Sequence, residues 1–412
     1  MPDAGRAELD PGRSGRVLKV GLAGTGFISD EHVLGYRGSA GAEIVAVCDL
    51  DLARARGWLE RWGLPAARAY DGLERMLDGE KLDLVEVLTP QTRHHDHVLL
   101  CAAAGVPFIS VQKPMAAGIA QCDRMIEACR AAGAVLRLYE NYVFYPVYHE
   151  AKRLLDDGVI GAPTSVRVHT IGGVRDGAPW PDFWVPADVR QSRSSVLVGD
   201  DGLHKFSLAC WLMDREIERI GAWIDPETPL DAPAFIRAKF RTNPGEPAKY
   251  AQIDFNFSTK LAIPSDVWLD DFVEICGELG VMWIHQCAGA GDRPLFRGNR
   301  MSSSSAFPPI AVFVDGRVTT YLDDLSPWER NWSTSFAACT RHFVGVATAG
   351  GTPVCTGEQG RDLNRYATAA LLSAQEGRDV DLSEVTSEAE EQGAFELRDN
   401  FCRIDSAKEA AR

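Results

Sequence analysis

The sequence predicts an α/β protein with two domains: a parallel sheet covered by helices, followed by an α+β domain on a large, mainly antiparallel open sheet. Between about residues 18 and 139, short apolar runs alternate with helical patterns, which is typical of parallel sheets. Beyond about residue 140, strand-like runs follow one another with few helices between them. The 412 residues also exceed the size of one ordinary core. We expect a disordered lead-in at 1–16, domains at 17–139 and 140–382, and a charged tail at 383–412.

Five runs in the first domain have the composition of buried parallel strands, because they are apolar on both faces. In chain order they are LKVGLAG, EIVAVCD, LDLVEVLTP, VPFISVQKP and AVLRLY. Amphipathic segments such as DLARARGWLERWG and HVLLCAAAG separate them. The second of these segments ends on a glycine, which is suited to stopping a helix. This alternation predicts helices that cover the sheet.

The second domain begins with a helical segment, PVYHEAKRLLDDG. The strand-like runs that follow are TSVRVHTI, FIRAKFRT, YAQIDFNFS, DDFVEICGELGVMWIHQ and AVFVDGRVTTYL. The Gly-Glu-Leu-Gly turn inside EICGELGVMWIH indicates a β-hairpin. Two helical stretches, STSFAACTRHFVGVATAG and GRDLNRYATAALLSAQEG, are predicted to close this domain.

The composition argues against several classes of partner. A formal net charge of −15 and a pI near 5.1 would repel phosphate backbones and anionic lipid surfaces. No stretch approaches the ~18–20 apolar residues that span a bilayer, and the N-terminus lacks the apolar core of a signal peptide. Ten cysteines are scattered without a C-x-x-C pair, which indicates reduced thiols. We therefore expect a cytoplasmic protein that binds neither nucleic acid nor membrane.

A glycine-rich stretch, VGLAGTGFISDEH, follows the first predicted strand and opens a helical pattern. Its segment Gly24–Ser29 matches G-x-G-x-x-G with serine in the third place, and Phe27 and Ile28 lie within it. The first glycine permits a tight turn, and the second, Gly26, lets backbone N–H groups approach a pyrophosphate. The third place needs only a small residue for helix packing. The strand–loop–helix context predicts a Rossmann dinucleotide-binding domain.

Asp49 ends the next predicted strand, 25 positions after Gly24. A carboxylate there can accept hydrogen bonds from both hydroxyls of the adenosine ribose. Leu50 follows it where an arginine would favour a 2′-phosphate, so the sequence predicts NAD rather than NADP. Asp49 would also suit the N-cap of a helix that starts near Leu52, and the two roles are compatible.

Two further segments carry candidate chemistry. In VQKPM, Lys113 precedes a proline at a predicted strand end, and proline pushes the preceding residue into extended geometry. Taken alone, a solvated loop lysine is the simpler interpretation. In VGDDGLHKFSLACWLMD, Asp200 and His204 are four residues apart, so a helix would place them on one face, and Gly202 leaves room for a ligand. The alternative is a capping aspartate and a surface histidine.

The order and spacing of these motifs resemble the Gfo/Idh/MocA family, the relatives of glucose-fructose oxidoreductase and inositol dehydrogenase. The resemblance runs from about Lys19 to Leu382. It rests on GLAGTGFISDEH, AVCDLDLARA, TPQTRHHDHVLLCAAAGVPFISVQKP, DDGVIGAPTSV, DDGLHKFSLACWLM and TGEQGRDLNRYATAALLSAQEGRDVDL. Several of these segments are weak singly, but together they are highly specific.

The resemblance implies catalytic roles. Lys113 matches the lysine of an E-K-P motif, beside the nicotinamide ring and the reacting hydroxyl, and the family makes the bond to Pro114 cis. Asp200 and His204 match a D-x-G-x-H motif, in which His204 is the acid/base and Asp200 binds the same substrate hydroxyl. Gln112 departs from this pattern, because it replaces the motif glutamate and loses its charge.

The resemblance also implies a second cofactor segment. Thr89, Pro90, Gln91 and His94 match a T-P-N-x-x-H segment that lines the cofactor after the fourth strand. Gln91 replaces the motif asparagine and keeps its hydrogen-bonding ability.

The chemistry of the residues agrees with these roles. Oxidation of a secondary alcohol requires a proton to leave the oxygen while hydride leaves the carbon, and histidine suits that proton near neutral pH. A lysine cation would stabilise the developing alkoxide, and nicotinamide carries the hydride. We therefore expect an NAD-dependent dehydrogenase that oxidises a secondary hydroxyl of a sugar, glycoside or cyclitol, with Lys113, Asp200 and His204 as catalytic residues.

Two other functions fit the same fold. The first, also suggested by the resemblance, is an NAD-dependent glycosidase or lyase, in which transient oxidation of a ring carbon allows elimination. The second is a non-catalytic NAD-sensing regulator. The presence of all three catalytic positions disfavours a regulator.

Other segments are candidates for substrate contact. Asn141 and Tyr142 follow Glu140 and the last parallel strand, where α/β proteins place binding residues. Trp180 and Trp184, with Phe183 between them, lie in GAPWPDFWVP, which suits either a substrate pocket or a subunit interface.

RHHDH suggests metal ligands, but His94, His95 and His97 would not converge on one point of a helix, so we expect no metal site. An open sheet has a face to cover, which predicts a homo-oligomer, a dimer or a tetramer, formed through the second domain's sheet.

Overall fold

The computed structural model describes residues 17–178, 197–224, 232–263, 266–286, 294–295, 299–302, 307–326, 329, 332–395 and 397. Contacts divide the chain into two compact units. The first unit comprises Met1–Asn141 and Ser335–Asp362, and the second comprises Tyr142–Thr334 and Leu363–Arg412. The lead-in predicted at 1–16 lies outside the described residues, as do residues 396 and 398–412 of the predicted tail.

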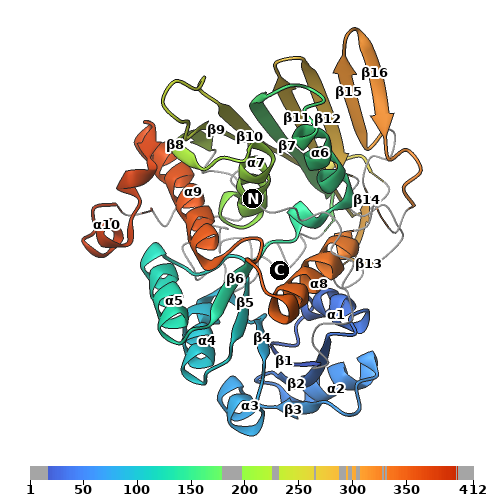
Figure 1. Cartoon of the computed structure of the whole chain (residues 1–412), viewed down its shortest axis with the longest axis vertical. Coiled ribbons are helices and arrows are strands. Elements are labelled where there is room, and N and C mark those ends of the chain that lie inside the picture. Colours follow the sequence, from blue (N-terminus) through green and yellow to red (C-terminus); the bar gives the residue numbers. More distant parts are fainter. Residues whose placement is uncertain are drawn as a thin grey trace. The chain divides into compact units, whose positions relative to one another are not determined.

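The first unit holds a parallel sheet of six strands in the order β3-β2-β1-β4-β5-β6. This is the Rossmann order, with the switch point between β1 and β4. In Figure 1, α1 and α2 lie on one side of this sheet, and α4 and α5 lie on the other. The elements are β1 (Leu18–Ala23), α1 (Ser29–Arg37), β2 (Ala42–Cys48), α2 (Leu52–Trp62), β3 (Arg68–Tyr70), α3 (Leu73–Gly79), β4 (Leu84–Val87), α4 (Gln91–Ala103), β5 (Phe108–Gln112), α5 (Ile119–Ala131) and β6 (Val135–Tyr139).

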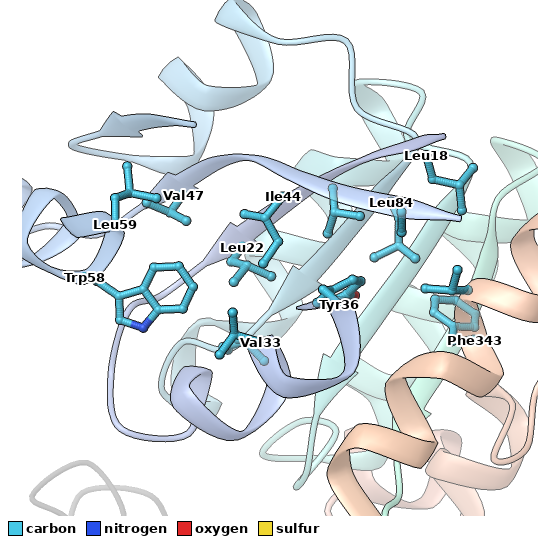
Figure 2. Close-up of a cluster of buried hydrophobic side chains, with 14 of the residues drawn as sticks. Leu18, Leu22, Val33, Tyr36, Ile44, Val47, Trp58, Leu59, Leu84 and Phe343 are labelled. Atoms are coloured by element: carbon cyan, nitrogen blue, oxygen red, sulfur yellow. The ribbon is translucent and has the colours of Figure 1, made fainter. Parts of the chain in front are cut away.

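A segment far along the chain completes the core of the first unit. The helix α8 (Trp332–Ala349) supplies Phe343, Val344 and Val346 to the buried cluster that holds Val33 and Tyr36 of α1. Figure 2 shows Phe343 beside the parallel strands, near Tyr36. The sequence-based boundaries include this helix in 140–382, whereas contacts group Ser335–Asp362 with the first unit. An apolar helix can pack against either sheet, so periodicity along the chain does not identify its partner.

The second unit is built on an eleven-stranded sheet with the main order β16-β15-β12-β11-β7-β10-β9-β8-β17. β10 runs parallel to β7 and β14 runs parallel to β11, and the other pairs are antiparallel. The strands are β7 (Pro163–Arg175), β8 (Ile217–Ile224), β9 (Ala234–Phe240), β10 (Tyr250–Leu261), β11 (Val267–Gly277), β12 (Gly280–Gln286), β13 (Pro294–Leu295), β14 (Asn299–Ser302), β15 (Ile310–Val314), β16 (Arg317–Tyr321) and β17 (Val380–Asp381).

The helices of the second unit are few, as predicted. α7 packs on β7 and β10, and α6 packs on β12 (Figure 1). α9 begins among residues of the first unit and continues into the second. The helical elements are η1 (Tyr142–Phe144), α6 (Pro146–Asp156), η2 (Leu197–Asp201), α7 (Gly202–Met213), α9 (Gly357–Glu376), η3 (Leu382–Glu384) and α10 (Ser387–Glu391).

The predicted fold class is confirmed in both units. The hairpin predicted in EICGELGVMWIH is the antiparallel pair β11–β12. A second hairpin, β15–β16, turns through Asp315 and Gly316, whose φ values of 51° and 73° are those of a two-residue type I′ turn. None of the helices in the described part of the chain is long and apolar enough to cross a membrane. The cysteines in the described ranges are free thiols, and burial raises the pKa of several, Cys48 to about 12.

Candidate active site

The glycine loop follows β1 at the switch point of the parallel sheet. Gly24 has a φ of +105°, and a Cβ there would lie 2.8 Å from the carbonyl oxygen of Leu88 in the loop after β4. Apart from Gly26 and its two chain neighbours, no atom of the described residues lies within 4 Å of a Cβ built at Gly26, so this position faces open space. Ser29 in the third place donates from Oγ to the Gly26 carbonyl at 2.5 Å. Phe27, between them, is half exposed, and Ile28 packs partly against the core. This geometry leaves the loop backbone accessible to a pyrophosphate.

Asp49 stands after β2 and binds the same loop. Its Oδ2 accepts hydrogen bonds from the backbone N–H of Thr25 at 3.1 Å and from Thr25 Oγ1 at 2.9 Å. Its Oδ1 accepts from the Asp51 N–H at 3.0 Å and lies 3.5 Å from Nη1 of Arg54. The N-cap of α2 is Asp51, which accepts from the N–H groups of Ala53 and Arg54. The alternative that Asp49 caps this helix is therefore wrong. Its carboxylate instead joins the segment after β2 to the glycine loop after β1, at the carboxyl ends of these strands.

The segment after β4 is tied to the segment after β5. Pro90 precedes the first residue of α4, Gln91, whose Nε2 donates to the Ala116 carbonyl at 2.8 Å. The ring nitrogens of His94 lie 2.8 Å from the Pro114 carbonyl and 2.7 Å from the Thr89 carbonyl. The side chains predicted to line the cofactor thus hold the backbone of the neighbouring segment, which contains the Lys113–Pro114 bond.

Lys113 is half-buried at the end of β5, and its peptide bond to Pro114 is cis. Its backbone N–H donates to Oε1 of Gln112 at 2.8 Å. The other end of that amide, Nε2 of Gln112, lies 3.0 Å from Nε2 of His32 in α1. Gln112 therefore links the Lys113 backbone to α1, the helix that follows the glycine loop.

His32 belongs to a fully buried polar network. Its Nδ1 lies 2.7 Å from Glu86 Oε2, and the Tyr36 hydroxyl donates to Glu86 Oε1 at 2.7 Å. Arg137 donates from Nη2 to the same Oε1 at 3.3 Å, and from Nη1 to the Cys339 carbonyl at 2.9 Å. Burial lowers the pKa of His32 although Glu86 opposes that shift. Burial alone would raise the pKa of Glu86, but His32, Arg137 and Tyr36 outweigh it, so that pKa is lowered and the carboxylate is ionised.

In the second unit, η2 leads directly into α7 and carries the D-x-G-x-H motif. Asp200 lies in η2, and His204 is buried in the first turn of α7. The imidazole of His204 stacks on the Tyr142 ring, with 4.1 Å between ring centroids and 12° between ring planes. Burial raises the pKa of Tyr142 well above its usual value, so the phenol is neutral. The alternative of a surface histidine is wrong.

Lys205, the next residue, has no exposed side-chain surface. Its Nζ donates to Asp271 Oδ2 at 2.8 Å, lies 3.3 Å from Asp201 Oδ2, and sits 4.2 Å from the centroid of the Tyr142 ring. The Thr170 hydroxyl donates to Asp271 Oδ1 at 2.6 Å. Burial alone would lower the pKa of Lys205, but Asp201 and Asp271 outweigh burial and raise it above its usual value, so the ammonium stays charged. A buried ion pair thus supports the ring that contacts His204.

The remaining substrate candidates are Asn141, Tyr142, Trp180 and Trp184. Asn141 is buried in the first unit, and its Nδ2 donates to Ser335 Oγ of α8 at 2.8 Å. Tyr142, the next residue, contacts His204 and Lys205 as described above. Trp180 and Trp184 lie outside the described residues.

Among the buried charges that sequence reasoning missed are those of Glu86, Arg137 and Lys205. Glu86 interrupts the apolar strand LVEV, Arg137 interrupts VLRLY, and Lys205 opens the otherwise apolar helical run KFSLACWLM. A charge inside an apolar run is a usable signal, because Lys, Glu and Arg are almost never fully buried unless they are paired. Their partners lie on other elements, so the sequence alone does not identify them.

Comparisons with known proteins agree with this geometry. Residues 18–140 match a model described as "Oxidoreductase family, NAD-binding Rossmann fold", and residues 148–282 match "GFO/IDH/MocA C-terminal domain". The chain is 29% identical over 376 residues to a D-apiose dehydrogenase of Paraburkholderia graminis, covering 90% of this chain and 92% of that protein. It is 25% identical over 348 residues to inositol 2-dehydrogenase 2 of Saccharopolyspora erythraea, covering 82% and 95%. An Agrobacterium radiobacter oxidoreductase, solved with NAD+, L-tartaric acid and magnesium, superposes with a TM-score of 0.67 at 22% identity, covering 89% of this chain and 99% of that one.

The fold, the open glycine loop and these matches together define an NAD-binding oxidoreductase. The two matched models describe an N-terminal and a C-terminal domain of the same family, and together they span more than half of the chain. The chain belongs to the Gfo/Idh/MocA family. The predicted cofactor, NAD, and the predicted enzyme class are confirmed.

Proposed function

We propose that the protein is an NAD-dependent dehydrogenase that oxidises a secondary hydroxyl group of a sugar, glycoside or cyclitol. The observation that carries this proposal is His204, a buried imidazole held flat against Tyr142, in the motif that begins with Asp200 in η2 and continues into α7. A buried, oriented imidazole suits a general base for a hydroxyl proton. Relatives named for D-apiose and inositol support polyhydroxylated substrates.

The first unit has features that fit NAD. The open backbone at Gly26 suits the pyrophosphate, and Asp49, which follows β2, supplies a carboxylate that can accept hydrogen bonds from ribose hydroxyls. Gln91 Oε1 is buried and receives no hydrogen bond from the described residues, so its capacity to accept a hydrogen bond is unused. NAD, when bound, supplies the acceptor for the hydride. In this proposal His204 takes the hydroxyl proton on a ring nitrogen, Asp200 binds the same hydroxyl, and the Lys113 ammonium stabilises negative charge developing on the oxygen.

The test is a screen of sugars and inositols, starting with D-apiose and myo-inositol, in which NADH absorbance is followed with NAD and with NADP. We expect turnover with NAD, and a loss of kcat of roughly 100-fold or more in both Lys113→Ala and His204→Ala, because each removes a group that acts on the reacting oxygen. NAD affinity, measured by calorimetry, should change little. A near-normal rate in His204→Ala contradicts the acid/base role. Product formation without NADH accumulation indicates the glycosidase or lyase, and a preference for NADP contradicts the role of Asp49.

We also propose that the protein is a homo-oligomer, a dimer or tetramer, formed through the sheet of the second unit. Trp223 on β8 and Phe235 on β9 are paired in register on one face, with 74% and 41% of their surfaces exposed. Arg237 lies on the same face, 5.9 Å from the Trp223 ring. Trp223→Glu should lower the mass measured by light scattering, because it places a charge in an apolar contact. An unchanged mass argues against this face.

A further inference from the structure

We infer that Glu86 and His32 are positioning residues for Lys113, acting through the side-chain amide of Gln112. The inference rests on the proposed function, because it takes Lys113 as the cation beside the reacting hydroxyl. The contacts form one continuous chain from Glu86 on β4 through His32 on α1 and Gln112 on β5 to the Lys113 backbone.

The directions of these hydrogen bonds follow from chemistry. A backbone N–H only donates, so the atom 2.8 Å from the Lys113 nitrogen is the amide oxygen of Gln112. The amide nitrogen therefore faces His32 Nε2 at 3.0 Å and donates to it. His32 Nε2 must then be an acceptor, so the imidazole proton is on Nδ1, which donates to Glu86 at 2.7 Å. Each donor in this chain meets one acceptor.

The network is neutral as a whole. The Glu86 carboxylate is matched by the Arg137 guanidinium, and both side chains are fully buried. Gln112 and His32 are both neutral, and the lowered pKa of His32 agrees with this state. The aromatic rings that face the imidazole in the described part of the chain are uncharged: Tyr139, at 3.8 Å between centroids, and Phe336, at 5.6 Å.

The amide at position 112 and the carboxylate at position 86 therefore depend on each other through His32. In Gln112→Glu, the new carboxylate has no donor for the lone pair of His32 Nε2, so the imidazole would have to take up a proton and lie between two carboxylates. In Glu86→Gln, the buried Arg137 guanidinium loses its counter-charge. Exchanging the two groups in Glu86→Gln/Gln112→Glu keeps one buried carboxylate, and a shift of the His32 proton from Nδ1 to Nε2 restores every hydrogen bond.

The experiment compares the two single variants with the double variant. We expect each single variant to lose at least about 10-fold in kcat with NAD affinity nearly unchanged, and the double variant to recover to within about 3-fold of the parent, because the sites are coupled through one imidazole. The loss in Gln112→Glu should grow as pH rises, since its imidazole must stay protonated. Gln121→Glu is the matched control: Gln121 Oε1 only accepts a hydrogen bond, from the Ala117 N–H, and a carboxylate keeps it.

Nitrogen-15 spectra of the histidines give a readout that needs no substrate. The His32 signal, identified by its loss in His32→Gln, should report protonated Nδ1 in the parent and protonated Nε2 in the double variant. Parent-like kcat in both single variants overturns the inference, as does an Nε2-protonated His32 in the parent. A double variant that recovers its melting temperature but not its kcat shows a structural role only and also overturns it. If no alcohol is oxidised but the tautomers and the coupling in unfolding free energy are as expected, the proposed function fails while the network stands.

Discussion

Some charged side chains of this protein are fully buried, where an unpaired charge would be strongly destabilising. Lys205 has no exposed side-chain surface, and Asp271, its partner at 2.8 Å, is equally buried. Removing two charges from water costs several kcal/mol per ion, and the pair offsets this only while both members and their hydrogen bonds are present. The Thr170 hydroxyl and the Tyr142 ring complete the coordination of this pair.

Lys205→Met should therefore lower the free energy of unfolding by about 3–5 kcal/mol, because it leaves Asp271 buried without its cation. Chemical denaturation measures this change. Adding Asp271→Asn should recover part of the loss, since it removes the fully buried uncompensated charge, whereas the carboxylate of Asp201 is partly exposed. Lys152→Met is the matched control: Lys152 pairs with Asp156 at 2.6 Å on α6, where the aspartate is 60% exposed, and should cost below about 1 kcal/mol. Equal losses in the two methionine variants would contradict this account.

At the scale of elements, two helices far apart in the chain approach each other closely. Gly35 of α1 faces α8, and a Cβ at Gly35 would lie 2.3 Å from Thr340 Cβ and 2.9 Å from the Ala337 carbonyl oxygen. The backbone oxygen cannot move aside as a flexible side chain can. α1 also carries His32 and Tyr36 of the Glu86 network, so a shift of this helix would disturb that network.

Gly35→Ala should destabilise the protein by about 1–3 kcal/mol, the usual cost of overpacking a close contact. The control is Gly57→Ala in the exposed part of α2, where the new Cβ meets no atom of the described residues within 4 Å beyond the adjacent backbone of α2 itself. That change should stabilise the protein by about 0.5–1 kcal/mol, because alanine has the higher helix propensity. In thermal unfolding, we expect a lower melting temperature for Gly35→Ala and a higher one for Gly57→Ala. A stabilised Gly35→Ala would mean that α1 and α8 do not pack in this way.

The whole molecule should lose stability in mild acid. Burial lowers the pKa of His32, His97, His149 and His285 below the ordinary value of 6.5. The unfolded chain then binds more protons than the folded chain, so the free energy of unfolding falls as pH drops below about 6.5. Each such histidine contributes up to about 1.4 kcal/mol per pH unit until its folded form also protonates.

Urea unfolding at pH 7.5 and pH 5.5 tests this expectation, with a lower free energy of unfolding expected at pH 5.5. His149→Gln should reduce the difference between the two pH values, because burial alone lowers the pKa of His149. Stability that is constant or rises towards pH 5.5 would contradict the neutral, buried state of these histidines.

The sequence by itself determined the features that depend on local pattern. Apolar runs that alternate with amphipathic segments identified the parallel strands of the first unit, and the glycine spacing identified the loop from Gly24 to Ser29. The resemblance of successive motifs identified the family and its cofactor, both confirmed. These features were readable because periodicity and backbone conformation are properties of neighbouring residues.

Only the tertiary structure decided which distant groups meet. His32, which joins the Glu86 carboxylate to Gln112, lies 80 positions from Gln112 in the chain. The helix α8 contributes residues to a core whose strands, β1, β2 and β4, lie more than 250 positions before those residues. Asp51 rather than Asp49 caps α2, and Lys205 finds its partner on β11. Burial and pairing depend on packing between elements, and no local pattern of one segment records the element that will cover it.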